Sequence, residues 1–159
     1  MIYTFYSFKG GVGRSMALAG VAYLLARRGL KVLAIDFDLE APGLERYFFE
    51  QDRGREVRAQ PGLMDLLKTY KLALTSEAEF TAGRFRSWWD FVTEAMPRLD
   101  GGGRLDLMTA GRREPESAMH DYAYAVRSFD WQDFFDNWKG EAFFGWFRQQ
   151  LLDGERGYD

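Results

Sequence analysis

Residues 2–16 read IYTFYSFKGGVGRSM, and this stretch decides the fold. The run from Ile2 to Ser7 is β-branched or aromatic at every position but the last, which predicts a strand. Three glycines end that run, and apolar residues then recur at helical spacing from Ser15 to Arg28. We therefore predict a strand, a glycine loop and a helix in direct succession.

The next segment completes a β-α-β unit. Lys31 to Asp36 holds the unbroken apolar run Val-Leu-Ala-Ile, typical of a parallel strand covered by helices on both faces. A helix that joins two such strands makes a right-handed crossover. The sequence thus predicts an α/β fold in three layers, with a mainly parallel sheet and helices on both faces.

The rest of the chain adds one strand and several helices to the same domain, which we take as residues 1–159. The sequence predicts a short helix over Leu63–Tyr70 and a strand over Arg104–Thr109, and the polar stretch 75–86 fits neither class. Residues 112–153 form an aromatic-rich helical part, with aromatic residues at helical spacing at 131, 134, 135 and 138 and again at 143, 146 and 147. Two amphipathic helices follow from this spacing.

The aromatic faces of these two helices have three possible uses. They can pack in a core or dimer interface, dock another protein, or lie on a membrane surface. Lys139 and Arg148 are the only cations between Trp131 and Leu152, too few to attract anionic lipid. We therefore expect a core or a dimer interface.

Composition excludes several classes of function. The 159 residues include no cysteine, so disulfides and thiolate chemistry are absent, and the single histidine excludes a multi-histidine metal site. A net charge of -3 gives no sign of nucleic-acid binding. No apolar run reaches the roughly 20 residues of a membrane span, and the N-terminus lacks the pattern of a signal peptide. These observations predict a cytoplasmic protein without a membrane span.

The glycine loop is suited to hold phosphate. Its glycines let backbone N–H groups approach an anion, and the start of the following helix adds unpaired N–H groups. Lys9 and Arg14 supply positive charge, and the Ser15 hydroxyl can reach a magnesium ion. The alternatives are a glycine turn without ligand and a dinucleotide-binding motif, in which Met16 would stand where the third glycine belongs.

The same residues resemble the deviant Walker A motif of the ParA/MinD family of P-loop ATPases, the CobQ/CobB/MinD/ParA nucleotide-binding domain. Lys9 matches the signature lysine, which in the family reaches the nucleotide of the partner subunit in a dimer. The segment from Ile35 to Gly43 resembles the second motif, by which Asp36 would serve magnesium and Asp38 would orient the attacking water. The resemblance therefore implies catalytic roles for Lys9 and Asp38, a metal site at Ser15 and Asp36, and a nucleotide site made of Lys9, Gly10, Gly11, Val12, Gly13, Arg14, Ser15 and Met16.

Three departures from the family pattern affect this interpretation. Arg14 stands at the usual loop lysine, and Phe8 stands at the glycine before the signature lysine. Arginine keeps the charge but not the compact ammonium geometry, so phosphate binding is better supported than fast hydrolysis. The strand that should carry the family's Walker B aspartate would begin near Asp159, so the resemblance implies a domain truncated before that strand.

Together the motifs predict an ATP-binding protein that uses ATP and Mg²⁺, a slow ATPase that switches by forming a homodimer through its nucleotide and acts on an unknown protein partner. The competing class is a non-catalytic nucleotide sensor or scaffold that regulates an effector. Phosphoryl transfer to another molecule is a third possibility. GTP is less favoured than ATP because we find no Asn/Thr-Lys-x-Asp segment that reads guanine.

Overall fold

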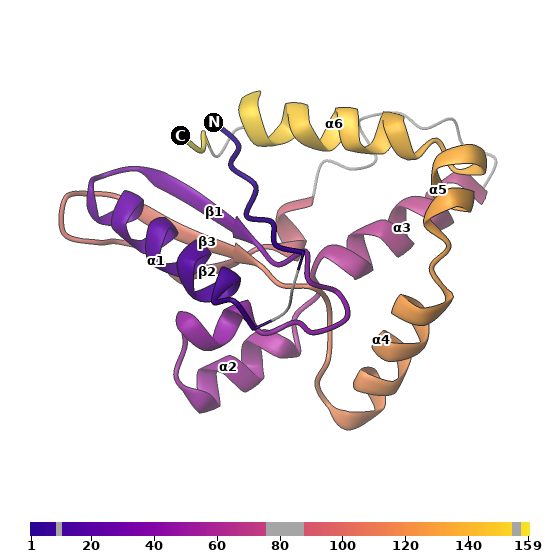
Figure 1. Ribbon diagram of the computed structural model, residues 1–159, viewed down its shortest axis with the longest axis horizontal. Helices are drawn as coiled ribbons and strands as arrows, with labels where there is room; N and C mark the ends of the chain where they lie inside the picture. The colour runs from indigo at the N-terminus through magenta and orange to yellow at the C-terminus, as the bar shows by residue number, and fades with distance from the viewer. Residues whose placement is uncertain (9–10, 76–87, 154–156) are drawn as a thin grey trace.

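A single mixed sheet lies at the centre of the computed structural model, which describes residues 1–8, 11–75, 88–153 and 157–159 (Figure 1). Strand β1 (Lys31–Ile35) pairs in parallel with β3 (Arg104–Met108), and β2 (Thr93–Met96) pairs antiparallel with the other edge of β3. The predicted α/β class is confirmed. The mainly parallel sheet is not, because one of the two strand pairings among the described residues is antiparallel.

Two of the three predicted strands are present. β1 and β3 match the predictions for residues 31–36 and 104–109 to within one residue at the C-terminal end. Both strands supply buried apolar residues, including Ala34, Leu105 and Leu107. The short strand β2 was not predicted, since four residues show little alternation and its pairing with β3 depends on a neighbour distant in sequence.

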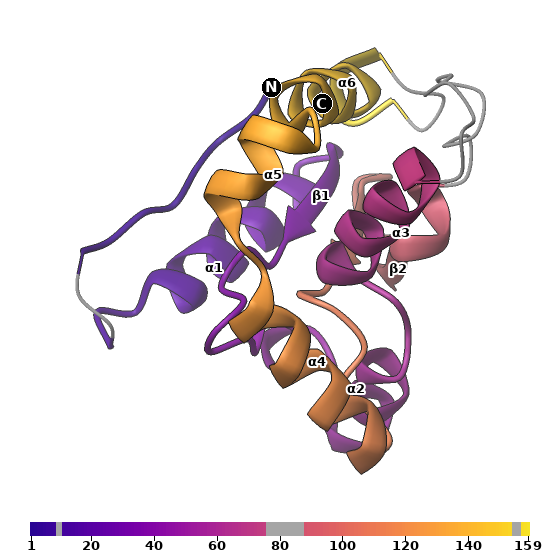
Figure 2. The same cartoon turned by 90° about the vertical axis from the view of Figure 1, so that its right-hand side faces the viewer.

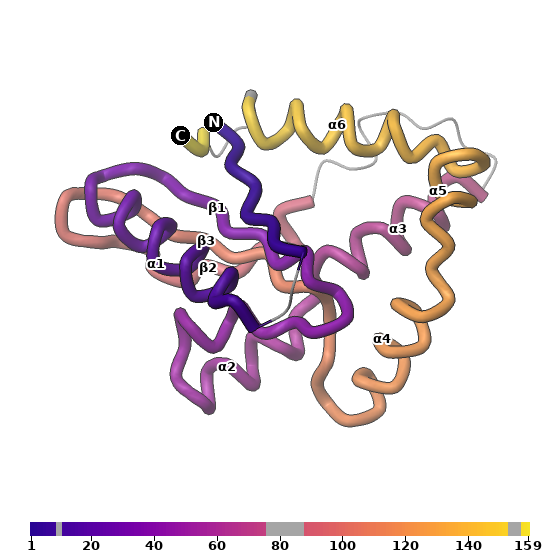
Figure 3. The backbone as a smooth tube through the Cα atoms, in the orientation of Figure 1, coloured from indigo at the N-terminus to yellow at the C-terminus, as the bar shows by residue number. Residues whose placement is uncertain are grey.

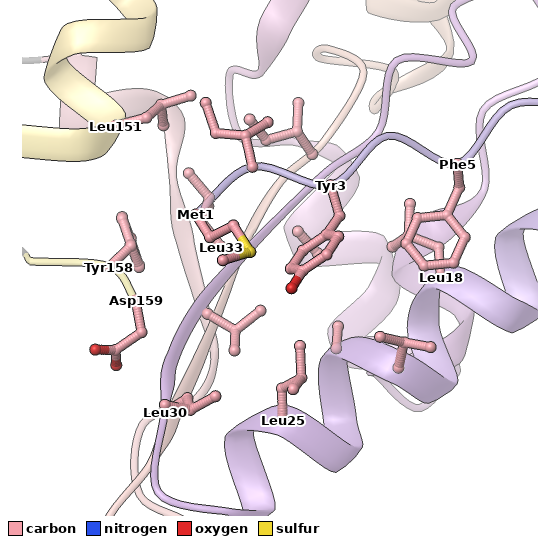
Figure 4. A pocket seen from close by; sticks show the side chains of 16 residues that line it. Met1, Tyr3, Phe5, Leu18, Leu25, Leu30, Leu33, Leu151, Tyr158 and Asp159 are labelled. Atoms are coloured by element: carbon pink, nitrogen blue, oxygen red, sulfur yellow. The ribbon is translucent and has the colours of Figure 1, made fainter.

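The predicted strand over residues 2–7 is wrong. These residues have irregular backbone, and side chains such as Tyr6 are 80% exposed. An apolar cavity of about 360 Å³ is lined by this segment, by α1 and by β1, and Tyr3, Leu25 and Leu33 are among its walls (Figure 4). β-propensity makes a strand only where a neighbouring backbone supplies hydrogen bonds, and here the segment borders a cavity instead.

One face of the sheet is covered by α1 (Arg14–Arg27), which confirms the helix predicted over residues 15–28. Its inner side carries three buried alanines, which pack with Leu105 and Leu107 of β3. The 3-10 helix η1 (Leu44–Tyr47) and α2 (Gln51–Arg58) add Leu44 and Val57 to the same cluster. Small side chains on α1 let the helix lie close to the sheet.

The remaining helices lie on the opposite side of the sheet from α1 or beyond the C-terminal ends of its strands (Figure 1 and Figure 2). These helices are α3 (Leu63–Thr75), the 3-10 helix η3 (Trp88–Phe91), α4 (Glu116–Ser128), α5 (Trp131–Asn137) and α6 (Gly140–Asp153). In β1, Val32 and Ala34 belong to the core on the α1 side, whereas Leu33 and Ile35 pack against the core on this side. This alternation is the period of two that a strand between two layers requires.

Helices α5 and α6 confirm the two aromatic helices that the spacing predicted. Phe134, Phe143 and Phe147 are buried, and the rings of Phe143 and Phe147 stack with centroids 5.9 Å apart. The aromatic stripe therefore packs mainly in the core. Among the helices of the described residues, none is both long enough and apolar enough to cross a membrane.

The two ends of the chain lie near each other beside the start of β1 (Figure 3). The backbone N–H of Asp159 donates to the Lys31 carbonyl at 3.0 Å, and the Lys31 N–H donates to the Asp159 carboxylate at 2.7 Å. These bonds use the backbone N–H and C=O groups of Lys31, the first residue of β1, on the edge of the strand that faces the N-terminal segment.

Candidate functional site

The loop before α1 contains two glycines with a left-handed backbone. Gly11 and Gly13 have φ angles of 73° and 78°, in the left-handed region that favours glycine. Gly13 directly precedes α1, and no described side chain caps that end of the helix. The first-turn N–H groups and the positive end of the helix dipole are therefore available to an anion. Lys9 and Gly10, predicted for the same loop, lie outside the described residues.

The loop that follows β1 meets the start of α1 (Figure 1). Nη2 of Arg14 forms an ion pair with Oδ2 of Asp38, and the two side chains are 30% and 31% exposed. Nη1 of Arg14 also donates to the Ser7 hydroxyl at 3.4 Å. The structure thus brings together the cation predicted to bind phosphate and the carboxylate predicted to orient water.

Asp36 organises the loop over residues 36–44. Its Oδ1 accepts a hydrogen bond from the Asp38 N–H at 3.2 Å, and its Oδ2 accepts from the N–H groups of Gly43 and Leu44 at 3.0 and 3.1 Å. The side chain is only 6% exposed, and this burial raises its pKa, against the opposing effect of the three backbone hydrogen bonds and the charge of Arg113. The carboxylate therefore ties the two ends of the loop together.

The residues predicted for magnesium offer suitable donor atoms. Mg²⁺ takes oxygen ligands and is commonly held by one or two carboxylates together with phosphate oxygens and water. The Ser15 hydroxyl and the Asp36 carboxylate fit this set, although both oxygens of Asp36 already accept hydrogen bonds. Within the described ranges, no group of three or more acidic or histidine side chains could hold a metal ion by itself. The metal roles of Ser15 and Asp36 stay predictions that depend on bound phosphate.

Two side chains from the segment after β3 hold the loop from the other side. The Tyr122 hydroxyl donates to the Leu39 carbonyl at 2.7 Å, and Nη1 of Arg113 donates to the Pro42 carbonyl at 3.4 Å. From the sequence, Arg113 could be a solvated charge or a residue that approaches the nucleotide or a partner. It is instead buried, with Nη2 3.0 Å from Oε2 of the buried Glu45.

Sequence reasoning missed these contacts for different reasons. Arg113 comes after β3, and the loop over residues 36–44 comes after β1, the parallel neighbour of β3. The sequence could therefore predict that Arg113 lies at the same edge of the sheet as this loop, but not that it pairs with Glu45. For Tyr122 and Glu45 the sequence holds no signal. Phe37, which lies between the two aspartates, also reaches across to the aromatic helices, with its ring 6.1 Å from Trp131 and 6.3 Å from Phe144.

A glycine loop at the start of a helix, next to an acidic loop that leaves a parallel strand, is the arrangement by which P-loop proteins bind nucleotides. Residues 3–134 match the family model of the CobQ/CobB/MinD/ParA nucleotide binding domain, and the chain belongs to this family. Comparisons with curated proteins and with solved structures gave no match.

Proposed function

We propose that the protein binds ATP with magnesium on residues 9–16 and hydrolyses it slowly, as a switch that dimerises through its nucleotide. The observation that carries the proposal is the pair of left-handed glycines at the start of α1, with Arg14 directly after them and Asp38 beside it. Membership of a nucleotide-binding family supports it.

In the proposed reaction, different groups of the chain have different roles. The N–H groups of the loop and of the first turn of α1 bind the phosphates, and the Arg14 guanidinium adds charge-assisted hydrogen bonds. Ser15 and Asp36 would hold magnesium, which when bound neutralises phosphate charge. Asp38 accepts a hydrogen bond from the attacking water and so orients it.

Binding of phosphate has a consequence for the ion pair between Arg14 and Asp38. A triphosphate carries more negative charge than Asp38 and competes with it for the Arg14 guanidinium, so in this proposal phosphate draws Arg14 away and leaves Asp38 free for water. Because both side chains are partly exposed, losing the pair costs only about 0.2–1 kcal/mol. Several charge-assisted bonds to phosphate offset this cost.

The variant Asp38→Asn tests both the role of Asp38 and the exchange of partners. We expect it to bind ATP as tightly as wild type or up to about fivefold more tightly, because Arg14 loses its competing partner. Phosphate release should fall by at least about tenfold, because an amide orients water poorly and carries no charge. Calorimetry and a phosphate-release assay measure the two effects. Asp52→Asn, on the exposed side of α2, is the matched control, and unchanged turnover in Asp38→Asn would remove Asp38 from the mechanism.

The competing function is a nucleotide sensor without turnover. It is favoured by one specific observation, namely that the cation at the usual lysine position is an arginine engaged by Asp38. Tight binding of ATP with no phosphate release by the wild-type protein would establish the sensor and exclude the ATPase.

Dimerisation rests on the resemblance of Lys9 to the signature lysine. We expect light scattering to show a doubled mass with magnesium and a non-hydrolysable ATP analogue but not with ADP, and we expect Lys9→Ala to stay monomeric. Arg28→Ala, at the far end of α1, is the control. A wild-type protein that binds the analogue and remains a monomer would contradict the dimer.

A further inference from the structure

The loop over residues 36–44 is held at two carbonyls by residues that belong to neither nucleotide motif. Tyr122 on α4 bonds the Leu39 carbonyl, one residue after Asp38, and Arg113 bonds the Pro42 carbonyl. The Asp38 carboxylate itself pairs with Arg14 at the start of α1. The loop therefore lies between α1 on one side and these two side chains on the other.

The side chain of Tyr122 is buried and closely packed. It is 5% exposed, and its ring packs against Gly111, where a Cβ atom would come within 2.8 Å of the ring. A tyrosine hydroxyl is protonated at neutral pH and can donate, and burial raises the pKa of this one further. Tyr124, two residues further along α4, is 75% exposed.

Arg113 is fixed just as firmly. Its Nε donates to the Gly111 carbonyl at 3.2 Å, its Nη2 bonds Glu45, and its guanidinium carbon lies 5.9 Å from the centre of the Tyr122 ring. Glu45 is fully buried and has a second, longer contact of 3.8 Å with Arg58. A guanidinium can make these bonds together because its donors point in several fixed directions.

We propose that Tyr122 and Arg113 are positioning residues that hold the loop over residues 36–44 so that the Asp38 carboxylate is presented at the start of α1. The proposal rests on the function proposed above, and neither side chain touches the nucleotide in it. They restrict the positions that the Asp38 side chain can take. The alignment of an attacking water depends on those positions.

Tyr122→Phe is the most direct test because it removes one hydroxyl and keeps the ring. We expect kcat for ATP to fall roughly five- to tenfold, about the effect of one net hydrogen bond, with the Kd for magnesium ATP within about twofold of wild type. Amide hydrogen exchange over residues 39–44 should become faster, with the rest of α4 unchanged. Tyr124→Phe should match wild type in all three measurements.

Arg113→Lys tests the second residue, since a lysine keeps the charge opposite Glu45 but cannot bond Glu45 and the Pro42 and Gly111 carbonyls together. The same split between kcat and Kd is expected, with Arg112→Lys, its exposed neighbour, as the control.

Two results would overturn the proposal. One is a Tyr122→Phe protein with wild-type kcat and wild-type exchange in the loop. The other is a lower melting temperature with faster exchange throughout α4, which would show a purely structural role. If the wild type itself releases no phosphate, the proposed hydrolysis fails, and exchange over residues 39–44 alone decides whether Tyr122 holds the loop.

Discussion

Gly13 shows at the scale of one residue how the loop before α1 is encoded. Its φ angle of 78° is costly for any residue with a Cβ, although a Cβ there would meet only the end of the Met16 side chain, at 3.7 Å. The requirement for glycine is therefore one of backbone conformation and not of space. Gly20, in the middle of α1, is exposed and has nothing within 4 Å of its Cβ position.

These two glycines give a matched prediction for stability. Gly13→Ala should lower the free energy of unfolding by about 1–2 kcal/mol, because alanine is strained in the left-handed region. Gly20→Ala should raise it by about 0.5–1 kcal/mol, because alanine is the better helix former. Urea unfolding of both variants measures the difference. A Gly13→Ala protein as stable as wild type would show that this loop does not need its left-handed turn.

The candidate site could be predicted only in part at this scale. Glycines followed by Arg14 and Ser15 form a local pattern, as do Asp36 and Asp38 after an apolar run. These residues could therefore be predicted as site candidates from the sequence alone. That Arg14 pairs with Asp38 is a contact across 24 positions, and the bond from Tyr122 to Leu39 spans 83. Contacts of this kind depend on the packing of helices and strands, which local pattern does not specify.

Helix α5 shows how an element is decided by its packing. Seven residues are too few for a stable isolated helix, so its stability depends on its neighbours. The Asp130 carboxylate caps its start by accepting from the Asp133 N–H at 3.0 Å, and Phe134 is completely buried. The Phe134 ring contacts the rings of Tyr70, Phe129, Trp131 and Phe143.

Two adjacent phenylalanines test the packing of α5. Phe134→Ala should cost about 3–5 kcal/mol of unfolding free energy, because it leaves a cavity among the rings of the core. Phe135→Ala should cost about 1 kcal/mol, because that side chain is 44% exposed and stacks mainly on Phe144. Chemical denaturation of both variants provides the comparison. Equal losses would mean that the aromatic face of α5 is not the one described.

The elements also differ in how far sequence could predict them. β1 carries four apolar residues in a row, and β3 carries Leu105, Leu107 and Met108, which are all buried, so both strands show their environment in their own residues, and α1 has a clear start and end. Residues 2–7 have the composition of a strand but border a cavity, and β2 has too few residues to show a pattern. In both cases the outcome depends on the neighbouring backbone and not on the segment.

Across the whole molecule, the candidate site joins segments that are far apart in the chain. The glycine loop and α1 meet the loop after β1, which is held in turn by the segment after β3 and touched by α5 and α6 through Phe37. A ligand that moves Arg14 therefore acts on a loop connected to both layers of helices. In the proposed function, nucleotide binding acts on the rest of the protein through this connection.

Calorimetric titration of magnesium ATP into the wild type and into Arg14→Ala tests the central claim most directly. We predict saturable binding of one nucleotide per chain, weakened at least about tenfold in Arg14→Ala through loss of a charge-assisted contact, with Arg28→Ala at the far end of α1 binding like wild type. A folded wild-type protein that takes up no ATP, or an Arg14→Ala variant that binds it equally well, would contradict a nucleotide site at the start of α1.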